Sequence, residues 1–322
     1  MTDSTRFALG TFAATPEDPF PGLVMDERVV DLRPLLGRDI TTHALFDDWE
    51  RSFETLAGIA ASGDGDAYPY DELRPLPPLI PRQILCAGAN YKTHVRQIVV
   101  STLRGQGDGR SEVELQAEAE RQLEARMSSE PYMFIAPSSA LCGAHDDVVL
   151  WKPGNCHDWE LELAVVVGRA GFDVDESEAL DYVAGYTISN DISVRDVQQR
   201  PGFPMTDFVM SKCRPTYFPT GPYVVPRHFI PDPRQLRVQL SVNGEMMQDE
   251  SVDDIIYGVE QLIAYASRSV GIQPGDLILT GSPAGNAGHH GNRWLVPGDV
   301  MVGHITDLGT QRNVCVASPG PS

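Results

Sequence analysis

Short apolar runs bounded by Gly, Pro, Asn or Asp recur along the chain, and this pattern is typical of β-strands. Residues 238–242, an Asn-Gly pair and residues 245–247 predict a hairpin, because Asn-Gly favours the tight type I′ turn. Pro-Gly-Asp turns at 274–276 and 297–299 each precede another apolar run. The pattern therefore predicts a strand-rich chain with few helices.

Helical spacing of apolar residues appears in three segments. One lies around residues 44–61, and another begins at a Ser251 cap and continues to Ala266. The third, residues 111–127, is rich in Glu, Ala, Gln and Arg and opens with a Ser-x-x-Glu pattern that resembles a capping box. Its apolar stripe is thin, so we expect residues 99–130 to form a segment that lies on the protein surface or a lid.

A proline-dense stretch from Leu73 to Pro81 cannot continue a helix and predicts a domain boundary. We therefore expect an N-terminal domain over residues 1–80 and a larger domain over residues 81–317, which carries the segment 99–130 as an insertion. A chain of 322 residues is long enough for both to contain a core.

Three carboxylates stand within or at the end of apolar runs. Glu160 and Glu162 alternate with leucines, so in a strand they share one face, and Asp191 ends a second apolar run. Like charges on a buried strand need a compensating cation or shared protons. All-oxygen ligands favour Mg²⁺, Mn²⁺ or Ca²⁺. The alternative is an edge strand whose glutamate face is hydrated.

The charge and the cysteines limit the partners and the compartment. With 45 acidic and 25 basic residues, the formal net charge is -20, which argues against nucleic acid or an anionic membrane as a partner. The five cysteines are scattered without CxxC spacing, which favours a reducing compartment. The N-terminal residues lack a signal-peptide pattern, and no apolar run is long enough to span a bilayer. We expect a cytoplasmic protein.

Several segments, in order, resemble the fumarylacetoacetate hydrolase family, and the resemblance extends from about Pro81 to about Val316. The matching segments contain a GxNYxxH motif, an ExE pair, an NDxSxRD motif and a TGSPAG motif; they are Cys86–His94, Ser138–Gly143, Asp158–Val166, Gly185–Thr187, Asn190–Gln198, Gln273–Asp276 and Thr280–Gly285. The resemblance implies a β-rich α+β fold, a mixed β-sandwich or roll with a small N-terminal domain, and a homodimer.

The resemblance also implies roles for single residues. His94 would be the catalytic base and Lys212 would lie beside the metal. The metal, Mg²⁺ or Mn²⁺ with Ca²⁺ possible, would be held by the three carboxylates described above. Gln198 and Thr280 would contact the substrate. Arg195 is a third candidate for substrate binding, and we expect it to form an ion pair with Asp196 that positions the Asp191 loop.

Two positions depart from the family pattern. Gln97 stands where hydrolytic members commonly have a glutamate that pairs with the histidine, and an amide cannot stabilise an imidazolium as a carboxylate does. A glutamate from the inserted helix is one hypothetical substitute; the candidates are Glu112, Glu114 and Glu118. Ala136 stands where many relatives have lysine. Without that lysine, it is an open question how the site would bind an acidic group at the end of a substrate.

These observations predict a metal-dependent hydrolase that cleaves a carbon–carbon bond in a 2,4-dioxo acid, such as an acylpyruvate, or a related 1,3-diketone. The alternative is an isomerase or tautomerase, decarboxylase or dehydratase of a 2-oxo acid, which the loss of the glutamate at Gln97 favours. A third possibility is an inactive scaffold that binds metal.

Overall fold

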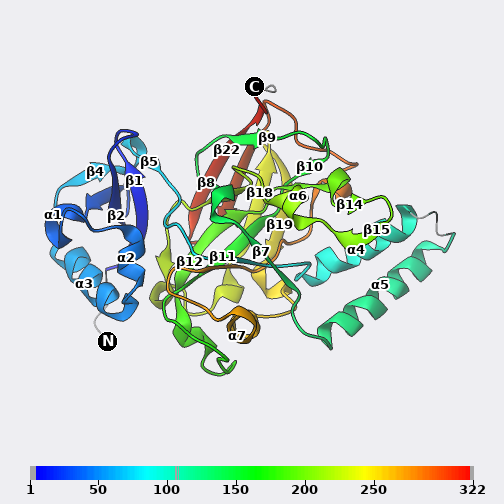
Figure 1. The fold of residues 1–322 in the computed structure, drawn as a ribbon, viewed down its shortest axis with the longest axis horizontal. Helices are drawn as coiled ribbons and strands as arrows, with labels where there is room; N and C mark the ends of the chain where they lie inside the picture. The colour runs from blue at the N-terminus through cyan, green and yellow to red at the C-terminus, as the bar shows by residue number, and fades with distance from the viewer. Residues whose placement is uncertain (1–4, 106, 108, 320–322) are drawn as a thin grey trace.

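The computed structural model describes residues 5–105, 107 and 109–319, and its ribbon is shown in Figure 1. Part of the glycine-rich stretch that precedes the inserted helix therefore lies outside the described residues. Residues 1–4 and 320–322 also lie outside them.

The N-terminal part of the chain forms an antiparallel sheet covered by helices, at the left of Figure 1. Its strand order is β4-β3-β2-β1-β5, with β1 Ala8–Ala13, β2 Pro19–Met25, β3 Arg28–Asp31, β4 Ala67–Pro69 and β5 Arg74–Pro75. The helices are α1 Arg33–Leu36, α2 Thr42–Phe46 and α3 Trp49–Ser62. The expected single helix at 44–61 is thus two helices, because the chain breaks at Asp47–Asp48.

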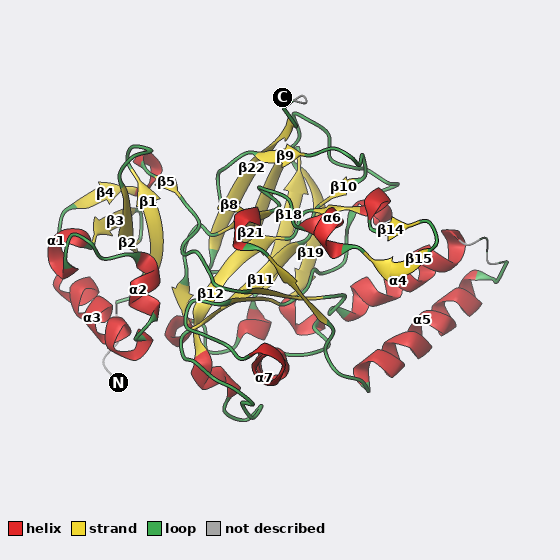
Figure 2. Cartoon of the chain, in the orientation of Figure 1, coloured by secondary structure: helices red, strands yellow, loops and turns green. Residues whose placement is uncertain are grey.

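The rest of the chain is built on two larger sheets, shown in yellow in Figure 2. The largest has the order β7-β6-β20-β11-β12-β16-β8, with β17 also paired to β12; its strands are β6 Ile84–Ala87, β7 Met133–Ala136, β8 Leu141–Gly143, β11 Leu161–Val167, β12 Val183–Asn190, β16 Phe218–Thr220, β17 Val225–Pro226 and β20 Leu277–Leu279. The other has the order β19-β18-β21-β22-β9, with β9 Val148–Leu150, β18 Arg237–Val242, β19 Glu245–Ser251, β21 Val300–Ile305 and β22 Gly309–Ala317.

Parallel and antiparallel pairs occur together, since β6 runs parallel to β20 whereas β11 runs antiparallel to both its neighbours. Buried residues of the N-terminal sheet and of the larger sheets form one continuous apolar cluster. The predicted β-rich α+β fold with mixed sheets is confirmed, and so is the predicted hairpin, whose Asn243-Gly244 turn joins β18 to β19.

The segment between β6 and β7 forms two helices, α4 Lys92–Gly105 and α5 Glu112–Met127, which pack side by side at the right of Figure 1. A small apolar cluster of Val99, Val100, Leu115 and Ala119 joins them, separate from the main core. Ser111 and Glu114 form the expected capping box at the start of α5.

Short elements complete the fold. They are the strand pairs β10 His157–Asp158 with β13 Ser193–Val194 and β14 Gln199–Arg200 with β15 Phe203–Thr206, and the helices α6 Phe208–Lys212 and α7 Val259–Val270. The prediction that the last helix begins at Ser251 is wrong: Ser251 caps a short 3₁₀ turn, and α7 starts after Gly258. No helix in the described part of the chain is long and apolar enough to cross a membrane.

Candidate metal centre and catalytic cavity

The three carboxylates meet where two central strands end. Glu160 immediately precedes β11, Glu162 lies within it, and Asp191 immediately follows β12. The strands pair antiparallel with Leu161 opposite Asn190, and the Asp191 amide donates to the Glu160 carbonyl at 2.9 Å. All three side chains are buried, and one oxygen from each lies within 4.8 Å of the others. Because β11 lies between β20 and β12, the hydrated edge-strand alternative is wrong.

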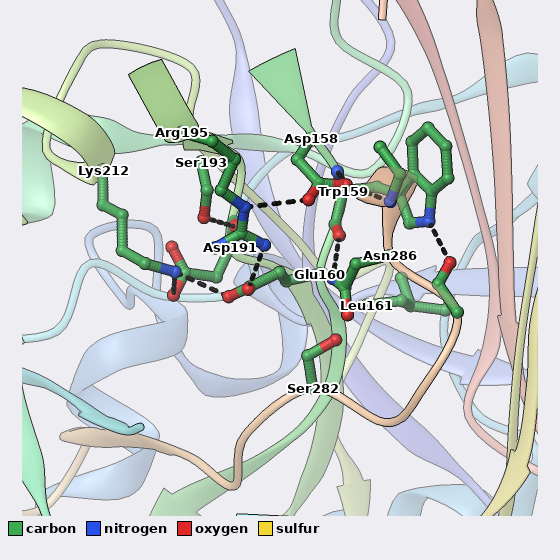
Figure 3. Close-up of polar contacts among 12 residues, drawn as sticks. Asp158, Trp159, Glu160, Leu161, Asp191, Ser193, Arg195, Lys212, Ser282 and Asn286 are labelled. Atoms are coloured by element: carbon green, nitrogen blue, oxygen red, sulfur yellow. Dashed lines mark hydrogen bonds and ion pairs between the residues drawn. The ribbon is translucent and has the colours of Figure 1, made fainter. Parts of the chain in front are cut away.

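Two cations, the buried Lys212 and the half-buried Arg195, stand against these carboxylates (Figure 3). Lys212, at the end of α6, donates from Nζ to Glu160 Oε2 and to Asp191 Oδ2, both at 2.6 Å. Arg195 donates from Nη2 to Glu160 Oε1 at 2.5 Å and from Nε to Asp158 Oδ2 at 2.8 Å. Glu160 is therefore bound by both cations.

The acidities of the three carboxyl groups diverge because of these contacts. Burial alone would raise the pKa of Glu160, but the charges of Lys212 and Arg195 outweigh it and lower the pKa to about 2. Burial raises the pKa of Asp191 to about 6, against the pull of Lys212. Burial, together with the charges of Asp191 and Glu160, raises the pKa of Glu162 well above its usual range.

The oxygen atoms available at this centre suit a hard divalent cation. Asp191 Oδ1 is buried and has no hydrogen-bond partner among the described residues. Glu162 Oε2 accepts one hydrogen bond, from the Gly281 amide at 2.7 Å. An orphaned buried carboxylate oxygen is costly unless a cation or a donor reaches it. An all-carboxylate donor set without Cys or His fits Mg²⁺ or Mn²⁺ better than Zn²⁺.

His94 lies in the first turn of α4, and a buried asparagine fixes the loop that leads to it. Asn90 donates from Nδ2 to the carbonyls of Tyr257 and Thr280 at 3.0 and 2.9 Å, and its Oδ1 accepts from the Tyr257 amide at 2.9 Å. These bonds tie the loop between β6 and α4 to the start of α7 and the end of β20. The asparagine of the GxNYxxH motif therefore fixes the backbone that leads to His94.

The His94 ring is buried, and its Nδ1 has no hydrogen-bond partner among the described residues. Burial lowers the pKa of His94 to about 4, although the nearby charge of Glu160 opposes that shift. The imidazole is therefore neutral at ordinary pH, which is the state that a general base requires.

One cavity of about 270 Å³ contains most of the predicted site. Of the predicted residues, it is lined by His94, Glu160, Glu162, Asp191, Arg195, Gln198 and Lys212. Thr280 is not part of its lining. The Thr280 amide donates to the Leu163 carbonyl at 3.0 Å, and its buried hydroxyl has no partner among the described residues.

The structure corrects the predicted partner of Arg195. Asp196 does not pair with it; its carboxylate accepts hydrogen bonds from the backbone amides of Asn155 and Cys156. Arg195 instead turns toward Asp158 and Glu160, so its influence on the carboxylate centre is direct.

The hypothesis of a substitute glutamate is also not supported. Gln97 accepts a hydrogen bond from the Gly285 amide at 3.3 Å and makes none with His94. Glu112 pairs with Arg104, Glu118 pairs with Arg121, and Glu114 caps its own helix. No glutamate of α5 lines the cavity.

Some cavity residues escaped the sequence analysis. Phe134 and Phe208 stack with ring centroids 4.2 Å apart, and Lys212 Nζ lies 5.5 Å from the centre of the Phe134 ring. Arg126 of α5 and Tyr132 line the same cavity. Phe134 and Tyr132 belong to an apolar run that offered no chemical signal, and Arg126 resembled one of many charges on a hydrated helix.

Comparison with known proteins identifies the family of the chain. Residues 83–316 match the model of the fumarylacetoacetate (FAA) hydrolase C-terminal domain. A 2,4-didehydro-3-deoxy-L-rhamnonate hydrolase from Sphingomonas sp. (strain SKA58) is 42% identical over 188 residues, which cover 57% of this chain and 64% of that protein. The human mitochondrial oxaloacetate tautomerase FAHD2B is 31% identical over 265 residues, covering 81% of this chain and 76% of that protein.

A solved structure shows the same fold. Maleylpyruvate hydrolase from Sphingobium sp. SYK-6, in complex with manganese(II) ion and pyruvate, superposes with a TM-score of 0.73 at 24% identity, covering 97% of this chain and 100% of that chain. The chain belongs to the fumarylacetoacetate hydrolase family. Relatives in this family include both hydrolases and tautomerases.

Proposed function

We propose that the protein is a divalent-metal-dependent hydrolase that cleaves a carbon–carbon bond in a 2,4-dioxo acid such as an acylpyruvate. The observation that carries this proposal is that three buried carboxylates and a neutral, buried imidazole line one cavity. Glu160, Glu162 and Asp191 would hold Mg²⁺ or Mn²⁺. The bound ion would supply a chelating centre for two substrate oxygens and charge stabilisation for an enolate.

The protein's own groups have defined roles in this reaction. His94 takes a proton from water, and the hydroxide attacks the carbonyl carbon distal to the acid. The carbon–carbon bond then breaks, its electrons form an enolate, and the proton held by His94 returns to the products. Lys212 is buried beside Glu160 and Asp191, so its charge stabilises negative charge that develops there.

A tautomerase of 2-oxo acids is the second candidate. The observation that favours it is the position of Gln97: no carboxylate of the described residues orients His94, whose Nδ1 has no partner. Moving a proton between carbon and oxygen of a 2-oxo acid requires a base but no attacking water. Tautomerisation therefore depends less than hydrolysis does on an imidazole that a carboxylate holds in place.

The test mixes the protein and Mg²⁺ or Mn²⁺ with acetylpyruvate, and in parallel with oxaloacetate. Loss of diketone absorbance with release of pyruvate and acetate supports the hydrolase, whereas faster enol–keto interconversion of oxaloacetate without cleavage supports the tautomerase. The His94→Ala variant should lose either activity. Metal binding without any reaction would leave the scaffold interpretation and refute both proposals.

The assembly is also a proposal. The family resemblance suggests a homodimer, and exposed apolar side chains at Phe203, Met205 and Val209 support a contact with a second copy near the cavity. Light scattering coupled to gel filtration would show a mass of twice 35.3 kDa if this is correct.

A further inference from the structure

Arg126 places a third cation in the cavity, from the last turn of α5. The end of this helix is fixed to the main body of the protein. The Tyr257 hydroxyl donates to the Arg126 carbonyl, and Ser129 Oγ lies 3.0 Å from the Tyr257 hydroxyl oxygen. The inserted helix is therefore held over the site by specific contacts.

Arg126 differs from the other two cations of the cavity in its partners. Lys212 and Arg195 each contact two carboxylates. Within the described part of the chain, Arg126 has no carboxylate at ion-pair distance: its Nη2 donates to the Gly88 carbonyl, and its buried Nε has no partner.

The chain has many carboxylates that could have paired with this arginine, since acidic residues outnumber basic ones by 45 to 25. The Arg126 side chain is half-buried, and this burial lowers its pKa. A guanidinium in this state is well prepared for a carboxylate ligand, because its planar donors match a carboxylate and part of its desolvation has already taken place.

We propose that Arg126 binds a second carboxylate of the substrate, so that the preferred substrates are 2-oxo dicarboxylic acids. This inference rests on the proposed function, which places the 2-oxo acid end of the substrate at the carboxylate centre. The carboxylate at that end is then committed, and only a further acidic group at the other end of the molecule can reach a different cation. Phe134 and Phe208 supply apolar walls of the same cavity for the intervening carbon chain.

The test uses binding rather than turnover. Calorimetry on the Mn²⁺-loaded protein compares 2-oxoglutarate with 2-oxopentanoate, and 2-oxoadipate with 2-oxohexanoate; each pair has the same chain length and differs in the terminal carboxylate. We expect at least one diacid to bind about tenfold or more tightly than its matched monoacid, the range for a charged hydrogen bond. Arg126→Met should remove this preference and leave the monoacid Kd within about threefold, and Arg126→Lys should retain part of the preference.

Arg121→Met is the matched control, because Arg121 lies on the same helix but pairs with Glu118 and is absent from the cavity lining. The proposal is overturned if wild type shows no diacid preference or binds none of the four acids. Persistence of the diacid preference in Arg126→Met also overturns the proposal. So does an equal loss of affinity for the diacid and for its matched monoacid in this variant, which would indicate that Arg126 only supports the loop at Gly88. A diacid preference without cleavage or tautomerisation would refute the proposed function and leave this inference standing.

Discussion

Glu160 and Glu162 are two residues apart, yet replacing each by glutamine should have very different consequences for stability. Glu160 is bound by Lys212 at 2.6 Å and by Arg195 at 2.5 Å. Glu162 contacts no cation within hydrogen-bond distance among the described residues, and its Oε2 accepts only from the Gly281 amide. Burial and the charges of Asp191 and Glu160 raise the pKa of Glu162, so its charged form is disfavoured in the metal-free protein, and glutamine is a neutral replacement of similar shape.

The expected magnitudes follow from these contacts. A hydrogen bond to a charged group contributes about 1.5–3 kcal/mol, and removing one partner of a buried ion pair costs about 3–5 kcal/mol. Glu160→Gln should therefore lower the free energy of unfolding of the metal-free protein by about 3–5 kcal/mol, because both Lys212 and Arg195 lose a charged acceptor. Glu162→Gln should lower it by about 1 kcal/mol or less, since the amide oxygen can still accept from Gly281.

Two measurements check the contrast. Guanidinium unfolding after treatment with EDTA gives the stability of each variant, and calorimetry with Mn²⁺ gives the metal affinity. Glu162→Gln should keep its stability and lose most of its Mn²⁺ affinity, because it removes one of three carboxylate ligands. Equal destabilisation by the two variants, or wild-type metal affinity in Glu162→Gln, would refute the reasoning.

Three further predictions concern the histidine and its surroundings. His94→Ala should lower kcat by about 100-fold or more while Mn²⁺ affinity measured by calorimetry stays within about twofold; an unchanged kcat would remove His94 as the base. Asn90→Ala breaks three buried hydrogen bonds and should cost about 3 kcal/mol in guanidinium unfolding, and a loss below about 1 kcal/mol would contradict its positioning role. The combined variant Glu112→Gln, Glu114→Gln and Glu118→Gln should keep kcat/KM within about twofold, because these side chains contact their own helix and neighbouring arginines; a large loss would restore the hypothesis of a substitute acid.

Only part of the carboxylate centre could be predicted from local periodicity. Alternation along one strand puts Glu160 and Glu162 on the same face whatever the fold. Asp191 joins them because β11 pairs with β12, and the family resemblance, not the periodicity, indicates it as a third ligand. The hairpin at Asn243-Gly244 and the capping box of α5 are equally local, since both arise from residues within a few positions of one another.

Some of the errors arose where partners lie far apart in the sequence. Asp196 is adjacent to Arg195 but bonds to backbone amides, and the true partner Asp158 comes from β10, which only strand pairing brings next to β13. Ser251 has the chemistry of a cap, but that chemistry also suits a 3₁₀ turn. Arg126 turns inward because Tyr257 holds the end of α5, which no local pattern could reveal.

The pairing of β6 with β20 also has a consequence for synthesis of the chain. Ile84 lies beside Leu277, Asn90 holds the Thr280 carbonyl, and Glu162 is bound by the Gly281 amide, so early segments depend on late ones. Contacts of such separation form slowly, and a polypeptide still emerging from the ribosome lacks them. Premature termination before β20 would leave an acidic cluster with no enclosing scaffold, and such a fragment would be a natural substrate for proteolytic quality control.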